Sequence, residues 1–356
     1  AHSLAVNAAG TATFGGGVGN VTALSSLDVA AAGGVMLNGS SVKTVGAQDY
    51  QGAVTLGADE LLTGSQISFG GAVDWAHTLT ILASTLTLSG NGDVGAPAVP
   101  IHTTVATVTD NKSSGTAYLS ETDGVSVNGT PTGSSLNLVA GGTVTLGGPL
   151  NFGAGNLTVN AGGDIAVDDA LSSAGGMLTA NSGAGTLTLS GGSDVGAPAA
   201  RIHVTVATVT DNKNSGMVYL DEADAVNIQG TTTGGSGLDL VAGGAIGQTA
   251  PLVMAGILIL NAGATHDITL DDPGNDFSTV GIVSGDNVIL RDANALDLAA
   301  STVSGNLYVY AAPVTFSGHV TAGYFNLLPP PASPPASGPV AVHVANVPPG
   351  HSDHAA

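Results

Sequence analysis

The chain has 356 residues, 54 of them glycine, and contains no cysteine. Its 5 Lys and Arg residues stand against 26 Asp and Glu residues, which gives a formal net charge of -21 at pH 7. Five basic residues are too few to neutralise a run of phosphates, so the composition argues against nucleic-acid binding and against docking on an anionic membrane. Without cysteine there is no disulfide, thiolate metal site or cysteine nucleophile.

The acidic residues predict strands rather than helices. Aspartate supplies 23 of the 26, and the only glutamates are Glu60, Glu121 and Glu222. Aspartate, glycine, serine and threonine favour turns, whereas helices in water need Glu, Lys and Arg on their outer faces. The densest apolar stretch, residues 251–260, is ten residues long and includes Pro and Gly. A transmembrane helix needs roughly 20 apolar residues, so we expect no membrane insertion.

The chain opens with strand patterns. Residues 3–7 (SLAVN) have the pattern of a strand within an array, and residues 27–37 form a unit of strand, Ala-Gly-Gly corner and strand. Residues 1–30 do not have the pattern of the polar cap that usually closes soluble repeat proteins. Two interpretations follow: the chain is cut from a longer protein, or its ends stack on copies of itself.

A long duplication follows. Residues 86–129 and 187–230 align with an offset of 101 residues, and 30 of the 44 aligned positions are identical. Each copy contains Thr-Asp-Asn-Lys, at 109–112 and 210–213. Asp-Asn followed by Ser-Gly or a similar pair is typical of turns, so we expect this motif to form a surface loop.

Shorter repeats lie within the long one. Residues 136–146 and 157–167 share the pattern of alternating apolar and polar residues around Ala-Gly-Gly, at a step of 21 residues. Residues 238–246 begin another copy. Alternation with period 2 indicates a strand with one buried face, and the glycines indicate corners. The sequence therefore predicts an all-β, right-handed parallel β-helix (β-solenoid) of about sixteen coils, on the order of 75–80 Å long, over residues 1–328.

The repeats also resemble a known group. Residues 157–176 (LTVNAGGDIAVDDALSSAGG), 275–311 and 10–34 look like the repeat regions of filamentous-haemagglutinin-like exoproteins and related large bacterial surface adhesins. The resemblance extends over nearly all of residues 1–328. It implies a β-helix displayed outside the cell, at the bacterial surface, that serves adhesion or builds a matrix.

The composition changes at Pro329. A polyproline stretch is followed by the alternating residues 339–347 and a His/Asp tail, so residues 329–356 are predicted to be a Pro-rich tether with a short strand. Three interpretations remain open: the strand docks on a neighbouring copy, docks on its own chain, or belongs to a linker. In the first, the subunit joint comprises Leu4, Val6, Val340, Val342, Val344 and Val347.

No catalytic arrangement is evident in the sequence, and we expect no enzyme activity and no cofactor, with Ca²⁺ as the one ion to consider. The candidate Ca²⁺ ligands are the adjacent carboxylates Asp168, Asp169, Asp271 and Asp272. Adjacent strand residues point to opposite faces, so these pairs are more typical of corners.

The leading functional hypothesis is a secreted structural protein that polymerises head to tail into a surface fibre or sheath, as in a biofilm matrix. The second is an adhesin spacer that binds glycans or proteins of a host or neighbouring cell, and the third is a polysaccharide-active β-helix enzyme.

Overall fold

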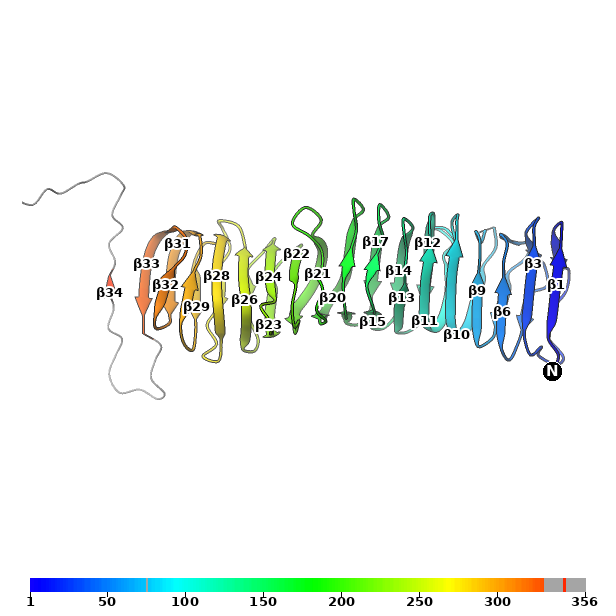
Figure 1. The fold of residues 1–356 in the computed structure, drawn as a ribbon, viewed down its shortest axis with the longest axis horizontal. Coiled ribbons are helices and arrows are strands. Elements are labelled where there is room, and N and C mark those ends of the chain that lie inside the picture. Colours follow the sequence, from blue (N-terminus) through cyan, green and yellow to red (C-terminus); the bar gives the residue numbers. More distant parts are fainter. Residues whose placement is uncertain (75, 330–341, 344–356) are drawn as a thin grey trace, which may run out of the picture. The chain divides into compact units, whose positions relative to one another are not determined.

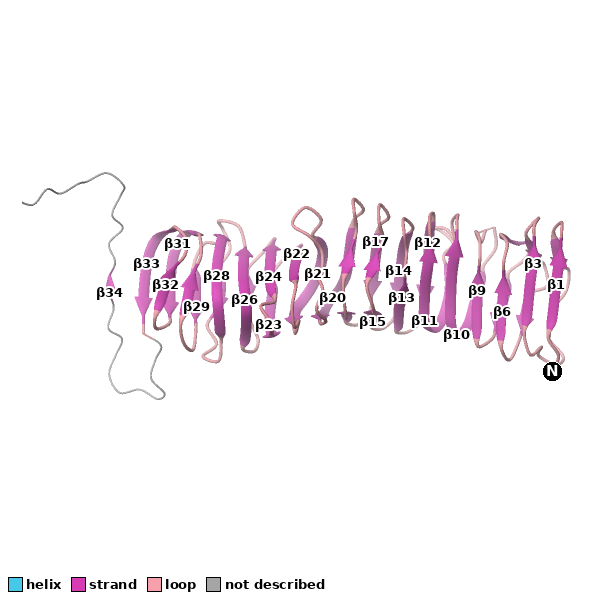
Figure 2. Cartoon of the chain, in the orientation of Figure 1, coloured by secondary structure: helices cyan, strands magenta, loops and turns pink. Residues whose placement is uncertain are grey.

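The computed structural model describes residues 1–74, 76–329 and 342–343. All of its regular elements are strands, and these residues include no helix that could cross a membrane. The strands pair in parallel from turn to turn and form a β-solenoid of about sixteen turns, as the sequence predicts. Figure 2 shows strands joined by loops only. A sandwich of two antiparallel sheets, the rival architecture for such a pattern, is therefore excluded for the described residues.

The chain divides into two compact units, residues 1–207 and 208–356. Strand β21 (Ile202–Asp211) includes the division. The sequence predicts another boundary, between the solenoid and the tail at residues 328 and 329, and this boundary stays a prediction. In each unit the strands follow one another along the stack in chain order (Figure 1).

The first unit contains twenty strands before β21. They are β1 (Leu4–Ala8), β2 (Ala12–Phe14), β3 (Leu27–Ala31), β4 (Val35–Leu37), β5 (Ser41–Lys43), β6 (Ala47–Tyr50), β7 (Val54–Leu56), β8 (Glu60–Thr63), β9 (Gln66–Phe69), β10 (Leu79–Gly90), β11 (Ile101–Lys112), β12 (Thr116–Glu121), β13 (Val125–Gly129), β14 (Ser135–Ala140), β15 (Val144–Leu146), β16 (Leu150–Asn151), β17 (Leu157–Ala161), β18 (Ile165–Val167), β19 (Leu171–Ser172) and β20 (Leu178–Leu189).

The second unit continues after β21. Its strands are β22 (Met217–Glu222), β23 (Val226–Thr231), β24 (Gly237–Ala242), β25 (Ile246–Gly247), β26 (Leu252–Asn261), β27 (Ile268–Leu270), β28 (Asp276–Ser284), β29 (Val288–Arg291), β30 (Leu296–Leu298), β31 (Ser301–Tyr310), β32 (Val314–Phe316), β33 (Val320–Leu328) and β34 (Val342–His343).

The predicted step of 21 residues is the register between the turns that contain β14, β17 and β20. Leu136 pairs with Leu157, and Leu157 pairs with Leu178. All three side chains are 1% exposed, so they form one buried column through three turns. The residues between them along each strand point outward, which is the two-residue alternation that the sequence shows. Columns of Val, Leu and Ile of this kind make the core of both units.

The Ala-Gly-Gly segments form corners, as predicted. At the first one, Gly34 has a φ of +89°, a conformation that L side chains rarely adopt. A Cβ on its neighbour Gly33 would lie 2.7 Å from the backbone nitrogen of Thr11 in the preceding turn. Glycine is therefore required here both for the bend and for the close approach of successive turns.

Candidate functional site

The first turn leaves its core face uncovered. Leu4 of β1 is in register with Leu27, and Val6 with Val29. Leu27 and Val29 are 1% and 0% exposed, whereas Leu4 is 37% exposed. Within the described part of the chain β1 pairs only with β3, so its other edge presents backbone groups without a strand partner. Such an edge can accept another parallel strand.

The last turn of the second unit shows the same feature. Phe316 of β32 is in register with Leu298 of β30. Leu298 is 0% exposed and Phe316 is 51% exposed, although both occupy the same inward column. The Phe316 ring packs edge to face against Phe325, with ring centroids 6.0 Å apart. This turn therefore presents a small aromatic surface made of core-type residues.

The tail meets this last turn. Strand β34 pairs antiparallel with β33, with Leu327 opposite Val342 and Asn326 opposite His343. Val342 is thus the one predicted joint residue of the tail with a described position, and it lies on its own chain. The predicted joint residues Val340, Val344 and Val347 lie outside the described residues.

The four candidate Ca²⁺ ligands lie in turns after strands. Asp168 and Asp169 follow β18, where Asp168 accepts a hydrogen bond from Ser190 and Asp169 accepts one from the backbone of Ala170. Asp271 and Asp272 follow β27, and Asp272 accepts a hydrogen bond from the backbone of Gly274 at 2.8 Å. The described residues contain no group of three or more His, Asp or Glu side chains placed to hold a metal ion.

The Thr-Asp-Asn-Lys motif is not a surface loop, so that prediction is wrong. In the first copy it is the end of β11, and the side chains of Asp110 and Lys112 are both 0% exposed. The inward alternation of Val108 continues through Asp110 to Lys112. This alternation with a period of two residues outweighs the turn propensity of Asp-Asn. It is the sequence signal that places the side chains of Asp110 and Lys112 on the inward face.

The buried charges are only partly compensated by hydrogen bonds. The Nζ of Lys112 donates to the carbonyl oxygen of Gly92 at 2.5 Å, and Asp110 Oδ1 accepts from the backbone N–H of Lys112 at 3.0 Å. Asp110 Oδ2 is buried without a hydrogen-bond partner. Burial raises the pKa of Asp110 to about 6, and the Lys112 backbone and charge limit this rise. Burial lowers the pKa of Lys112.

The second copy repeats this arrangement inside the other unit. Asp211 and Lys213 are 1% and 0% exposed, and Asp211 Oδ1 accepts from the backbone N–H of Lys213 at 3.1 Å. Asp211 Oδ2 is again buried without a hydrogen-bond partner, and burial raises the pKa of Asp211 to about 6. The same geometry in both copies indicates that the buried aspartate and lysine are part of the packed interior of the duplicated segment.

All three glutamates of the chain are also buried. Glu60, Glu121 and Glu222 are 3%, 3% and 1% exposed. The carboxylate of Glu121 accepts hydrogen bonds from the backbone N–H groups of Val105 and Thr122, at 3.1 and 2.9 Å. Burial raises the pKa of Glu60 and of Glu121. These carboxylates point into the solenoid, and that of Glu121 is tied to the backbone at the corner after β12.

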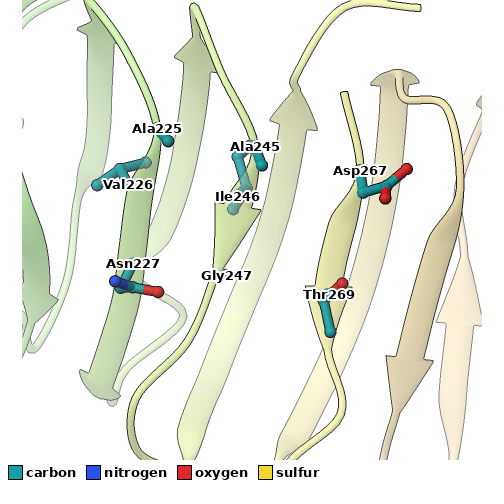
Figure 3. Close-up of a pocket in the computed structure, with 8 residues that line it drawn as sticks. All are labelled: Ala225, Val226, Asn227, Ala245, Ile246, Gly247, Asp267 and Thr269. Atoms are coloured by element: carbon teal, nitrogen blue, oxygen red, sulfur yellow. The ribbon is translucent and has the colours of Figure 1, made fainter. Parts of the chain in front are cut away.

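A hollow of about 230 Å³ lies on the outer surface of the second unit. It crosses β23, β25 and β27 at the point where the outward residue of β25 is Gly247 (Figure 3). Its lining is Ala225, Val226, Asn227, Ala245, Ile246, Gly247, Asp267 and Thr269. Asn227 and Thr269 lie on opposite sides of Gly247, so the hollow has an apolar floor and polar side walls.

Three of the six tyrosines gather on the same unit. Tyr308 and Tyr310 lie on β31, and Tyr324 lies on β33. The rings of Tyr308 and Tyr324 are 6.2 Å apart at their centroids and tilted by 56°. The guanidinium carbon of Arg291 lies 5.3 Å from the centroid of the Tyr310 ring. The sequence does not predict this cluster, because the number of residues from one turn to the next varies here between 18 and 20.

The family comparison concerns the second unit. The model of a family described as repeats of unknown function (DUF5649) matches residues 215–284 and 285–323. No curated protein and no solved structure matches the chain. The chain is thus similar over these residues to a repeat family whose description gives no activity, and its repeat solenoid fold is compatible with a structural or adhesin-like role.

Proposed function

We propose that the chain is a non-catalytic structural protein of the bacterial cell surface, a subunit that joins copies of itself end to end into an extracellular fibre or sheath. The observation that carries this proposal is the exposure of core-type side chains at the terminal turns, Leu4 at 37% and Phe316 at 51%. Each of these side chains is already about half buried or more, so burying the rest on another copy would contribute roughly 0.5–1.5 kcal/mol. The two ends of the subunit are different surfaces, so each contact joins the last turn of one copy to the first turn of the next. Such head-to-tail contacts give an open filament when they do not close into a ring.

The location is supported by the resemblance of the repeats to filamentous-haemagglutinin-like exoproteins. The alternative is an adhesin spacer, which predicts a monomer with a saturable ligand on a host or neighbouring cell. A polysaccharide-active enzyme is the third possibility, and release of reducing sugars from a polysaccharide would favour it.

The test replaces one exposed core residue at each end. In negative-stain electron microscopy, the unaltered chain is expected to form filaments that lengthen with concentration, whereas Leu4→Asp and Phe316→Asp each give single subunits. An equimolar mixture of the two variants keeps one intact joint per pair, so it is expected to give dimers and nothing longer. Val283→Asp is the matched control, because Val283 is 54% exposed but lies away from the terminal turns, on β28.

Single subunits of the unaltered chain at all concentrations would refute end-to-end assembly, and so would filaments in both end variants. The tail is tested by ending the chain at Leu328. If the tail strand joins neighbours, through Val342 among others, it must first leave β33, and its deletion shortens the filaments. Filaments of undiminished length would remove the tail from the joint.

A further inference from the structure

We propose that the outward face formed by β23, β25, β27, β29, β31 and β33 binds a neutral linear polysaccharide. The hollow lies toward one end of this face and the tyrosine cluster toward the other. The proposal goes beyond end-to-end assembly, because the face lies along the second unit, away from the inward columns of the terminal turns. A single subunit would therefore bind as a filament does.

The registers place the hollow and the tyrosines in line. Asn227 pairs with Gly247, and Ile246 pairs with Ile268, which puts Gly247 beside Thr269. Continuing from turn to turn, the outward column contains Asn227, Gly247, Thr269, Ile289 and Tyr308, and the next position, Asn326, is buried. Successive strands lie roughly 4.8 Å apart, so the column is roughly 19 Å long. The distance between successive strands is comparable to the length that one pyranose ring adds to a linear polysaccharide.

The two copies of the repeat differ on their outer face at the hollow. Ala245 and Gly247 occupy the positions of Thr143 and Thr145 in the first copy, while Ile246 replaces Val144 on the inner side. The smaller side chains at these two positions leave more room beside Asn227 and Asp267, within a hollow of about 230 Å³. A sugar ring fits such a space, with its C–H face on the small apolar residues and its hydroxyls toward the amide and carboxylate.

A polar ladder connects the hollow to the tyrosines. Asp267 Oδ1 accepts hydrogen bonds from the backbone and the side-chain nitrogen of Asn287, both at 3.0 Å. The side-chain nitrogen of Asn306 donates to Asn287 Oδ1 at 2.9 Å, and Asn306 pairs with Tyr324. Amide and carboxylate groups in one row offer both donors and acceptors to successive sugar hydroxyls.

The tyrosine end supplies ring faces and one cation. Tyr324 is 37% exposed, and its ring lies beside that of Tyr308. Arg291 is held over the Tyr310 ring, and within the described residues no carboxylate oxygen lies within 4.0 Å of its guanidinium nitrogens. Exposed aromatic rings take the apolar face of a sugar, and a guanidinium can donate to its hydroxyls through its terminal nitrogens, since Nε of Arg291 is buried.

The charge of the face argues for a neutral ligand. The chain carries a formal net charge of -21, and Asp267 belongs to the lining of the hollow. Arg291 is the only cation on these strands, so a polyuronate would meet net repulsion.

The experiment uses the Leu4→Asp chain, which keeps binding separate from assembly, on a printed array of neutral and acidic oligosaccharides. At least one neutral oligosaccharide of five or more sugars is expected to bind, and hexagalacturonate is expected not to bind. Binding only to acidic oligosaccharides, or to none, would overturn the proposal.

Variants then locate the site by calorimetry with the bound oligosaccharide. Ala245→Thr, which restores the first copy's residue, and Tyr308→Ala are each expected to weaken binding about tenfold. The matched controls are Ala293→Thr, in an exposed turn off the face, and Tyr118→Ala, at the half-buried outward tyrosine of the first unit. Circular dichroism checks that each variant is folded. Equal affinity in Ala245→Thr and Ala293→Thr would overturn the proposal, because they make the same chemical change.

Discussion

Replacing Gly176 by alanine is expected to lower the free energy of unfolding by about 2–3 kcal/mol or more. A Cβ at Gly176 would lie 1.8 Å from the carbonyl oxygen of Gly155 and 2.5 Å from its carbonyl carbon. The colliding atoms are backbone, so they cannot swing aside as a side chain does. Gly155 stands in the same relation to Ser134, 1.8 Å from its carbonyl oxygen. Three successive turns therefore approach one another through positions that accept no side chain.

Gly175→Ala is the matched control, one residue away. A Cβ at Gly175 would meet no atom within 4 Å, and its backbone is not in the left-handed region. This substitution is expected to be neutral, or to stabilise by about 0.4–1 kcal/mol through the unfolded state. Urea unfolding followed by circular dichroism measures both variants. Equal stabilities for the two variants would show that the turns separate at little cost in free energy.

Lowering the pH from 7 to 5 is expected to stabilise the fold. Burial raises the pKa of Asp110 and of Asp211 to about 6, whereas an unfolded aspartate titrates near 3.9. The folded state therefore binds more protons between these values, and stability falls as the pH rises from about 4 through about 6. Between pH 7 and pH 5 the gain is about 1 kcal/mol per carboxyl, or about 2–3 kcal/mol for the pair. Glu60, Glu121 and Asp292 shift in the same direction.

The double variant Asp110→Asn, Asp211→Asn tests this assignment. Asparagine keeps the shape of the protonated carboxyl but cannot ionise, so the urea midpoint is expected to vary less between pH 5 and 7.5 than in the unaltered chain. Asp168→Asn, Asp194→Asn removes the same formal charge and serves as the control. An unchanged pH slope in the first double variant would place the titrating groups elsewhere.

The stacking of the turns could be predicted from the sequence because one face of each strand is buried. The alternation in Leu136–Leu138 and Leu157–Val159 fixes which side chains point inward, and the Ala-Gly-Gly corners fix where each turn bends. A slip of one residue would turn every apolar side chain outward, so the register follows from hydrophobic burial alone. The 21-residue step is confirmed for this reason.

The outer surface could not be predicted in the same way. Outward columns depend on the number of residues in every turn, and this number varies where corners lengthen or shorten. Ile289 and Tyr308 are 19 residues apart, and Asn306 and Tyr324 are 18 apart, yet each pair is in register. The hollow could not be predicted either. Ala245 and Gly247 have small side chains, but the sequence does not tell which residues lie beside them on the adjacent strands. Turn propensity predicts a loop at Asp110 and Asp211, whereas the strand period, which the structure follows, turns both charges inward.

The divergence of the two copies has an evolutionary consequence. Leu138 and Leu240 are identical inward residues, while Thr143 and Ala245 differ outside. Inward and outward side chains lie on opposite sides of each strand, so an outward substitution can leave the packed interior as it is. A coil of this chain can therefore serve as an exchangeable cassette, so that grafting a new set of outward residues onto an old interior creates a new recognition surface without redesigning the scaffold.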